Sequence, residues 1–115
     1  MYEYRAKLDR IIDGDTIDVT IDLGFDVHIK SRIRLYGINT PETRTRDLEE
    51  KKRGFAAKER LEELLFNRNL ILQSKEYNKG KYGRVLGVII VVNPEGRVNI
   101  NEQLLEEGHA ERYMS

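Results

Sequence analysis

The first third of the chain alternates between apolar and polar residues, which is the pattern of a strand with one buried face. Residues 16–23 follow this alternation, and after Gly24 it resumes and continues to Leu35. Two such runs joined by a short link that contains glycine predict an antiparallel hairpin. Residues 2–12 carry apolar side chains at the even positions near their start, so we expect a further strand before the hairpin.

From about Asp47 the apolar positions change to a helical spacing. They recur at i, i+4, i+7 and i+8, in the order Ala57, Leu61, Leu64, Leu65. This stripe predicts an amphipathic helix that ends near Asn67. Asp47 and Glu50 have the spacing of a capping box and predict its first turn. A start nearer Gly54 is an equal alternative, because glycine weakens a helix interior.

The second half contains two more strands and a short helix. The segments follow in the order strand 70–76, basic loop 78–83, apolar strand 84–92, turn 93–96 and helix 99–108. Asn99 and Glu102 are spaced for a cap at the start of this helix, and Gly108 can end it. The resulting order βββαββα is that of a mainly β protein, a five-stranded OB-fold barrel with two helices. The same pattern also permits a small open α+β sheet.

Length and composition indicate one domain over residues 1–115. Apolar residues make up 39% and charged residues 35%, with 20 basic and 20 acidic side chains. The formal net charge of +0 gives no indication of a polyanionic partner, so a basic surface would need local clustering. The absence of cysteine excludes disulfides and thiolate metal sites.

The sequence carries no sign of a membrane or export segment. No run of 18 apolar residues occurs, and residues 1–10 are too charged for a signal peptide. We therefore expect no membrane insertion, and a cytoplasmic location is slightly favoured.

Two carboxylates flank a glycine in the stretch IDGDT, residues 12–16. Aspartate and glycine are typical of a tight turn between strands, and this interpretation gives Asp13 and Asp15 no further role. Alternatively, Asp15 stands at the mouth of a strand as a hard oxygen ligand for Ca²⁺ or Mg²⁺.

The stretch RLYGINTPE, residues 34–42, runs from a strand into a proline turn. Arg34 and Glu42 can form a surface ion pair there, with Pro41 only stiffening the turn. Alternatively, Arg34 binds a phosphate and Glu42 faces a water molecule. A planar guanidinium suits the first role because it binds two phosphate oxygens at once.

The stretch KYGR, residues 81–84, precedes the most apolar strand. By itself it predicts only a loop before a strand. Alternatively, Arg84 is a second strand-anchored arginine, and Lys81 and Tyr82 hold a nucleic-acid backbone and stack on a base.

Together these three stretches carry the groups that phosphodiester hydrolysis requires. Water attack on phosphorus needs a cation near the phosphate, a group that acts on the water, and positive charge for the transition state. The chain offers an acidic turn, a displayed glutamate and two arginines on strands. The two histidines, His28 and His109, lie in no motif, and the sequence has no competing nucleophile constellation.

In this combination the sequence resembles the thermonuclease family, the staphylococcal-nuclease-like domains. The resemblance rests on collinear motifs over nearly the whole chain: IDGDT, RIRLYGINTPE, GFAAKERLEELL, KYGRVLGVI and NINEQLLEEGHA. It implies an OB-fold barrel that hydrolyses DNA and RNA with Ca²⁺, by water attack on phosphorus with departure of the 5′ oxygen. We expect a monomer that acts on single-stranded or frayed substrate, because the chain has no excess of basic residues.

The resemblance also implies roles for individual residues. Arginines would clamp the phosphate, and a glutamate would act on the attacking water as general base or by orienting it. Metal would be held by side-chain oxygens and one backbone carbonyl. The implied residues are Arg34, Glu42 and Arg84 for catalysis, Asp15, Asn39 and the Thr40 carbonyl for calcium, Asp13 behind the metal loop, and Lys81, Tyr82 and Tyr113 for the nucleotide.

The sequence departs from the family pattern in two places. At Asn39 the family has an aspartate that ligates calcium directly. An amide oxygen can still coordinate a hard cation but adds no charge, so we expect weaker calcium binding. The alternative is that Asn39 is a turn residue and the metal site is lost. The sequence also stops at Ser115, where family enzymes commonly continue, so the C-terminal helix of the family is expected to be missing.

Three kinds of function remain open on these grounds. One is an active metal-dependent nuclease, which is favoured because the residues for catalysis and Asp15 occur together. The second is a non-catalytic OB-type module that binds nucleic acid or protein, with a lapsed metal site. The third is a structural domain of a larger assembly, in which the charged run EEKKR, residues 49–53, is only a solvated face.

Overall fold

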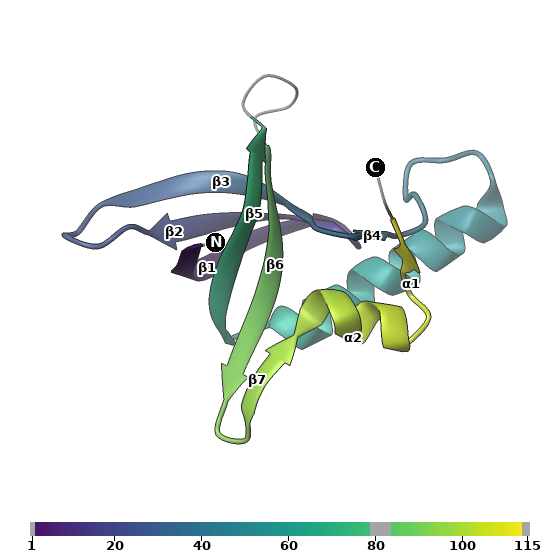
Figure 1. Cartoon of the computed structure of the whole chain (residues 1–115). Helices are drawn as coiled ribbons and strands as arrows, with labels where there is room; N and C mark the ends of the chain where they lie inside the picture. Colours follow the sequence, from purple (N-terminus) through teal and green to yellow (C-terminus); the bar gives the residue numbers. More distant parts are fainter. Residues whose placement is uncertain (1, 79–83, 114–115) are drawn as a thin grey trace.

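A computed structural model describes residues 2–78 and 84–113, with residues 76–78 and 84 described by their backbone alone (Figure 1). Five long strands form a closed barrel: β1 (Tyr2–Asp13), β2 (Thr16–Asp22), β3 (His28–Leu35), β5 (Asn69–Asn78) and β6 (Arg84–Asn93). Neighbours in the order β3-β2-β1-β5-β6 are antiparallel, and a parallel pairing of β3 with β6 closes the barrel. The predicted OB-type barrel is confirmed, and the open sheet is excluded.

Three short strands and two helices complete the described elements: β4 (Ile38–Asn39), α1 (Leu48–Leu65), β7 (Gly96–Asn99), α2 (Ile100–Glu106) and β8 (Glu111–Arg112). β7 pairs with β6, whereas β4 and β8 form a separate two-stranded sheet. The sequence pattern did not predict these three strands, because elements of two to four residues are too short to show a period.

The barrel interior and the inner faces of both helices form one hydrophobic core. Strands β2 and β3 contribute alternate residues, as their periodicity predicted, and α1 contributes its apolar stripe. Side chains with almost no exposure include Ile17, Val19, Ile33, Leu35, Leu61, Leu65, Leu70, Leu72, Ile89 and Leu104. Each such side chain stabilises the fold by roughly 1.5–3 kcal/mol relative to an exposed position. This core fixes β3, which carries Arg34, and α1, whose Gly54 contacts the backbone of Glu42.

Helix α1 starts at the predicted cap. Oδ1 of Asp47 accepts hydrogen bonds from the backbone N–H groups of Glu49 and Glu50 at 3.0 and 3.2 Å. The alternative start near Gly54 is therefore wrong. The reciprocal half of the predicted capping box is also absent, because the Glu50 carboxylate accepts its hydrogen bond from the backbone of Glu42.

Helix α2 is joined to the barrel by a buried side chain. Asn101, in the first turn of α2, is 3% exposed and contacts β6 and the segment after β3. Its Oδ1 accepts a hydrogen bond from the N–H of Ile89 at 3.2 Å, and its Nδ2 donates to the carbonyls of Tyr36 and Gly87 at 2.9 and 3.2 Å. This amide holds the segment between β3 and β4 against β6, so it helps to fix the backbone next to the candidate site.

The two helices also contact each other, and they lie together on one side of the strands (Figure 1). Arg60 of α1 donates two hydrogen bonds to the Glu107 carboxylate at 2.6 and 2.8 Å, and this contact lowers the pKa of Glu107 to about 2. Asn99 caps the start of α2 as predicted, by accepting from the N–H of Glu102 at 3.1 Å. Within the described residues, no helix is both long and apolar enough to cross a membrane.

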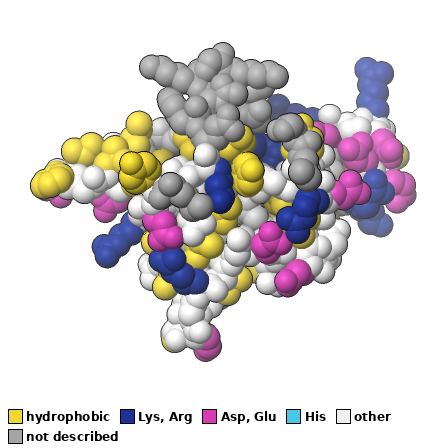
Figure 2. Space-filling model, in the orientation of Figure 1, with side chains coloured by type: hydrophobic (Ala, Val, Ile, Leu, Met, Phe, Trp, Pro, Cys, Tyr) yellow, Lys and Arg dark blue, Asp and Glu magenta, His cyan; other side chains and the backbone are white. Residues whose placement is uncertain are grey.

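The tip of the β2–β3 hairpin projects beyond the core, where Figure 2 shows hydrophobic side chains at the left edge of the molecule. Its turn is formed by three residues of positive φ, Gly24, Phe25 and Asp26. Phe25 is fully exposed, and about half of the surface is exposed at Leu23, Val27 and Ile29. The sequence alternation assigned these side chains to the buried face, which is wrong at this end. Periodicity gives the side of a strand that a residue faces, but not how far the core extends along it.

Candidate active site

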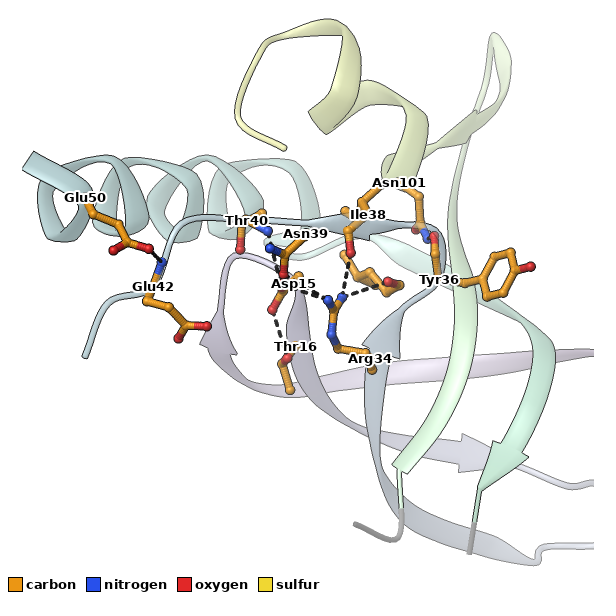
Figure 3. A network of polar contacts seen from close by, with 11 residues as sticks. Asp15, Thr16, Arg34, Tyr36, Ile38, Asn39, Thr40, Glu42, Glu50 and Asn101 are labelled. Atoms are coloured by element: carbon orange, nitrogen blue, oxygen red, sulfur yellow. Dashed lines mark hydrogen bonds and ion pairs between the residues drawn. The ribbon is translucent and has the colours of Figure 1, made fainter. Parts of the chain in front are cut away.

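Arg34 lies near the end of β3, and its guanidinium is the centre of a polar network (Figure 3). Its Nη1 group donates hydrogen bonds to the backbone carbonyls of Leu35 and Ile38, each at 2.9 Å. Its Nη2 group donates to Oδ1 of Asn39 at 3.2 Å and lies 3.4 Å from Oδ2 of Asp15. Because the side chain is 15% exposed and held at four points, its positive charge has one orientation.

Asp15 is buried at the end of the tight β1–β2 turn and joins the same network. Its backbone carbonyl accepts from the N–H of Leu35 at 2.8 Å. In its carboxylate, Oδ1 accepts from the Thr16 hydroxyl at 3.0 Å and Oδ2 from the N–H of Thr40 at 3.1 Å. These donors aim the carboxylate at Arg34, and each carboxylate oxygen keeps acceptor capacity for another partner.

Asn39 and Thr40 follow each other at the end of β4. The pairing of β4 with β8 sets Asn39 directly opposite Glu111. Asn39 is exposed, whereas Thr40 is 3% exposed. The Thr40 hydroxyl has no hydrogen-bond partner among the described residues, and it faces Gly14, where a Cβ would lie 2.9 Å from it. The glycine of the IDGDT turn therefore allows the turn to pack against Thr40.

Glu42 lies two residues beyond Thr40 with an exposed side chain, and helix α1 fixes its backbone. The N–H of Glu42 donates to Oε2 of Glu50 at 3.3 Å. A Cβ added at Gly54 would lie 2.5 Å from the carbonyl oxygen of Glu42 and 2.8 Å from that of Pro41. Glu50 and Gly54 are four residues apart and so share one face of the helix. This face holds the loop that displays the Glu42 carboxylate.

Replacing Gly54 with alanine should therefore destabilise the protein, although alanine in a helix normally stabilises relative to glycine. The added methyl group must push the loop away from α1, at a cost of about 1–3 kcal/mol. Thermal unfolding measures the effect. Lys52→Ala, at an exposed position of the same helix, should leave the melting temperature unchanged; an equal or higher melting temperature for Gly54→Ala would contradict the close approach.

Two further residues of the implied set join this neighbourhood. Asp13 accepts a hydrogen bond from the hydroxyl of the buried Thr43, so it ties the end of β1 to the segment after Glu42. The guanidinium carbon of Arg34 lies 5.9 Å from the centre of the Tyr113 ring, within the range of a cation–π contact. The N–H of Tyr113 donates to the carbonyl of Gly37 at 2.8 Å, and this hydrogen bond holds the backbone of Tyr113 near the site.

The remaining implied residues lie at the edge of what the structure describes. Arg84 is the first residue of β6, and its backbone is the parallel register partner of Arg32. Lys81 and Tyr82 lie outside the described residues. The structure thus brings together Asp15, Arg34, Asn39, Thr40 and Tyr113, holds Glu42 close by in the chain, and gives no side-chain position for Arg84.

The residues implied for calcium match its chemistry in kind. Among residues 2–78 and 84–113, no group of three or more Asp, Glu, His or Cys side chains is arranged to hold a metal ion. The implied set instead combines one carboxylate (Asp15), one amide oxygen (Asn39) and the Thr40 carbonyl, all of them hard oxygens that Ca²⁺ takes as ligands. Asp15 and Asn39 already share one positively charged partner, the Nη2 group of Arg34. The donor types fit a hard cation, but their single formal negative charge, on Asp15, is already paired with Arg34.

Comparison with known proteins identifies the family of the chain. Residues 32–115 match the model of the staphylococcal nuclease homologue family. The chain belongs to this family. It is 34% identical to the micrococcal nuclease of Shigella flexneri over 96% of its length, and 32% identical to a thermonuclease of Staphylococcus hyicus over 94%. It is also 32% identical over 97% of its length to an uncharacterized protein of Methanocaldococcus jannaschii.

The chain spans only part of these relatives, 59% of the Shigella and Staphylococcus nucleases and 60% of the Methanocaldococcus protein. The relationship shows the family and its barrel fold. The activity, substrate and metal of this chain are proposals.

The sequence did not single out three residues that the structure adds to the site. Glu50 was assigned to a helix cap and Gly54 to a weak point of the helix, whereas both hold the Glu42 loop. Glu111 was assigned no role, and the structure pairs it with Asn39. The available signal was the glycine itself, because a glycine inside an otherwise regular helix often marks a close backbone approach.

Proposed function

We propose that this chain hydrolyses phosphodiester bonds of DNA or RNA, with Ca²⁺ as its cofactor and water as the nucleophile. The observation that carries the proposal is the convergence of Asp15 and Asn39 on the Arg34 guanidinium, next to the segment that displays Glu42. The N–H of Thr40 donates to the same Asp15 carboxylate and so joins this segment to the network. Positive charge from an arginine and oxygen ligands for a hard cation then lie side by side. A phosphate bound there would be neutralised from two directions.

In the proposed reaction Arg34 binds the scissile phosphate and stabilises the charge that develops on its oxygens. Glu42 takes a proton from the attacking water, or orients that water, as its oxygen bonds to phosphorus. The bond from phosphorus to the 5′ oxygen breaks, and this oxygen leaves with a proton from solvent. Calcium held by Asp15, Asn39 and the Thr40 carbonyl would supply further positive charge beside the phosphate. Arg84, at the start of β6, is proposed as the second arginine.

Roles in nucleotide binding are proposed from the resemblance to the family, and the structure adds only the position of Tyr113 beside Arg34. Tyr113 stacks near the arginine that binds the phosphate, and Lys81 and Tyr82 hold the rest of the nucleotide. Single-stranded or frayed DNA is the proposed substrate, because the chain has equal numbers of acidic and basic residues and little general attraction for a duplex.

Removal of calcium should abolish cleavage. A fluorescently labelled single-stranded DNA is incubated with the protein in millimolar Ca²⁺ and, separately, in excess EDTA. We expect cleavage at least about 100-fold faster with calcium, since the metal supplies several kcal/mol of transition-state stabilisation. Equal rates under the two conditions would refute calcium as the cofactor.

A second candidate is a non-catalytic module that binds nucleic acid or protein. It is favoured by the weak negative charge of the implied calcium site. Asp15 is the sole formally charged ligand in the implied set, and the amide oxygen of Asn39 accepts a hydrogen bond from Arg34. This alternative predicts binding of the labelled DNA without cleavage in Ca²⁺, Mg²⁺ or Mn²⁺. Cleavage under any of these conditions excludes it.

A further inference from the structure

The neutral residue of the implied metal site has a carboxylate directly across from it. Asn39 on β4 and Glu111 on β8 are register partners in an antiparallel pair. Residues opposite each other in such a pair point to the same face of the sheet, with Cβ atoms about 4.5–5.5 Å apart. The position without charge therefore has a full negative charge beside it.

Among residues 2–78 and 84–113, no partner neutralises the charge of Glu111. Its neighbour on β8, Arg112, pairs with Glu102 at 3.3 Å. The Glu111 carboxylate itself makes no hydrogen bond or ion pair with any residue that the structure describes. An exposed carboxylate beside a cation site attracts the cation through space, and water and salt weaken this attraction.

Both residues line a pocket of about 360 Å³ next to Glu42. The acidic residues that line this pocket are Glu42, Glu50 and Glu111. Its one basic side chain among the lining residues is Arg53, and His109 is the remaining titratable group. Three carboxylates against one guanidinium give a negative pocket, which attracts a cation and repels a phosphate. We therefore expect the phosphate to bind next to Arg34 and the cation to be attracted by Glu111 on β8.

We propose that Glu111 supplies the negative charge that Asn39 lacks, and so strengthens calcium binding from the neighbouring strand. This inference rests on the proposed function, because it assigns a residue to the calcium site of that function. Glu111 acts through space or through a water molecule and is a positioning charge for the metal. It is not a residue that contacts the reacting phosphate.

Calcium calorimetry on wild type and Glu111→Gln tests the inference without any measurement of cleavage. We expect affinity to fall about 3- to 10-fold in about 20 mM salt, the size of a single charge acting over several ångströms in a high-dielectric setting. In about 0.5 M NaCl the two affinities should converge, because the Debye length falls to a few ångströms. A loss caused by altered structure would persist at high salt.

Two further variants complete the test. Asn39→Asp added to Glu111→Gln should return the affinity to the wild-type value or above it, because it restores the charge one strand away. Glu95→Gln removes an equal charge at the exposed β6–β7 turn and should leave calcium affinity unchanged. Equal affinities for wild type and Glu111→Gln at low salt would overturn the role of Glu111 and leave the nuclease proposal standing. Absence of calcium binding to wild type would overturn both.

Discussion

The Glu42→Gln variant should cleave single-stranded DNA about 100- to 10,000-fold more slowly than the wild-type chain, with little change in stability. An amide has nearly the shape of the carboxylate but cannot accept a proton from water, and general base catalysis contributes in this range. The Glu42 side chain is exposed, and its backbone is held by Glu50 and by the close approach of Gly54. The substitution should therefore leave the loop in place and remove only the chemistry.

Initial rates at saturating calcium and substrate measure this effect, with thermal unfolding as the check on folding. The loss should appear in kcat, because Glu42 is assigned to the water and not to substrate binding. Glu59→Gln is the matched control: it removes the same charge at an exposed position of α1 and should keep the wild-type rate. A Glu42→Gln enzyme that retains a third or more of the wild-type rate would remove Glu42 from its assigned role.

The barrel was predictable from sequence because its strands carry a clear period and its helix a clear stripe. The alternation in β2 and β3 correctly assigned Ile17 and Ile33 to the core. It failed at Phe25 because alternation continues past the end of the core, onto the projecting hairpin. Closure through the parallel β3–β6 pairing also lay beyond any local pattern, since it joins residues about 50 positions apart.

The candidate site was predictable where its residues sit next to long elements. Asp15 directly precedes β2, and Arg34 lies on β3. The pairing of these two strands sets Thr16 opposite Arg34 and so brings Asp15 close to Arg34. Local rules failed for Glu50, because a tertiary hydrogen bond to the Glu42 backbone replaced the reciprocal cap. They could not find Glu111 either, because its pairing with Asn39 depends on two strands of two residues each.

Substitution of Arg34 by lysine should lower kcat about 100-fold or more while keeping the positive charge. In the structure the guanidinium bridges two carbonyls, an amide oxygen and a carboxylate at the same time. A lysine ammonium is a point charge with three donors and cannot span these groups or bind two phosphate oxygens side by side. Loss of an arginine-type donor from the transition state is worth this much in comparable sites. The same substitution should also destabilise the fold by about 1–2 kcal/mol, because the carbonyls of Leu35 and Ile38 lose their donors.

Arg32→Lys separates the catalytic part of this loss from the structural part. Arg32 precedes Arg34 by two residues on β3, so it lies on the same face, and it binds Asp18 through two hydrogen bonds of 2.8 and 3.1 Å. Its replacement also breaks a bidentate pair on this face, yet cleavage should stay within about twofold of wild type because Asp18 is not a ligand of the proposed site. Rates are compared well below the melting temperature of each variant, so that unfolding does not contribute. If Arg34→Lys and Arg32→Lys lower the rate by the same factor, the guanidinium of Arg34 has no specific role in phosphate binding. The arginine then serves only to hold the turn between β3 and β4.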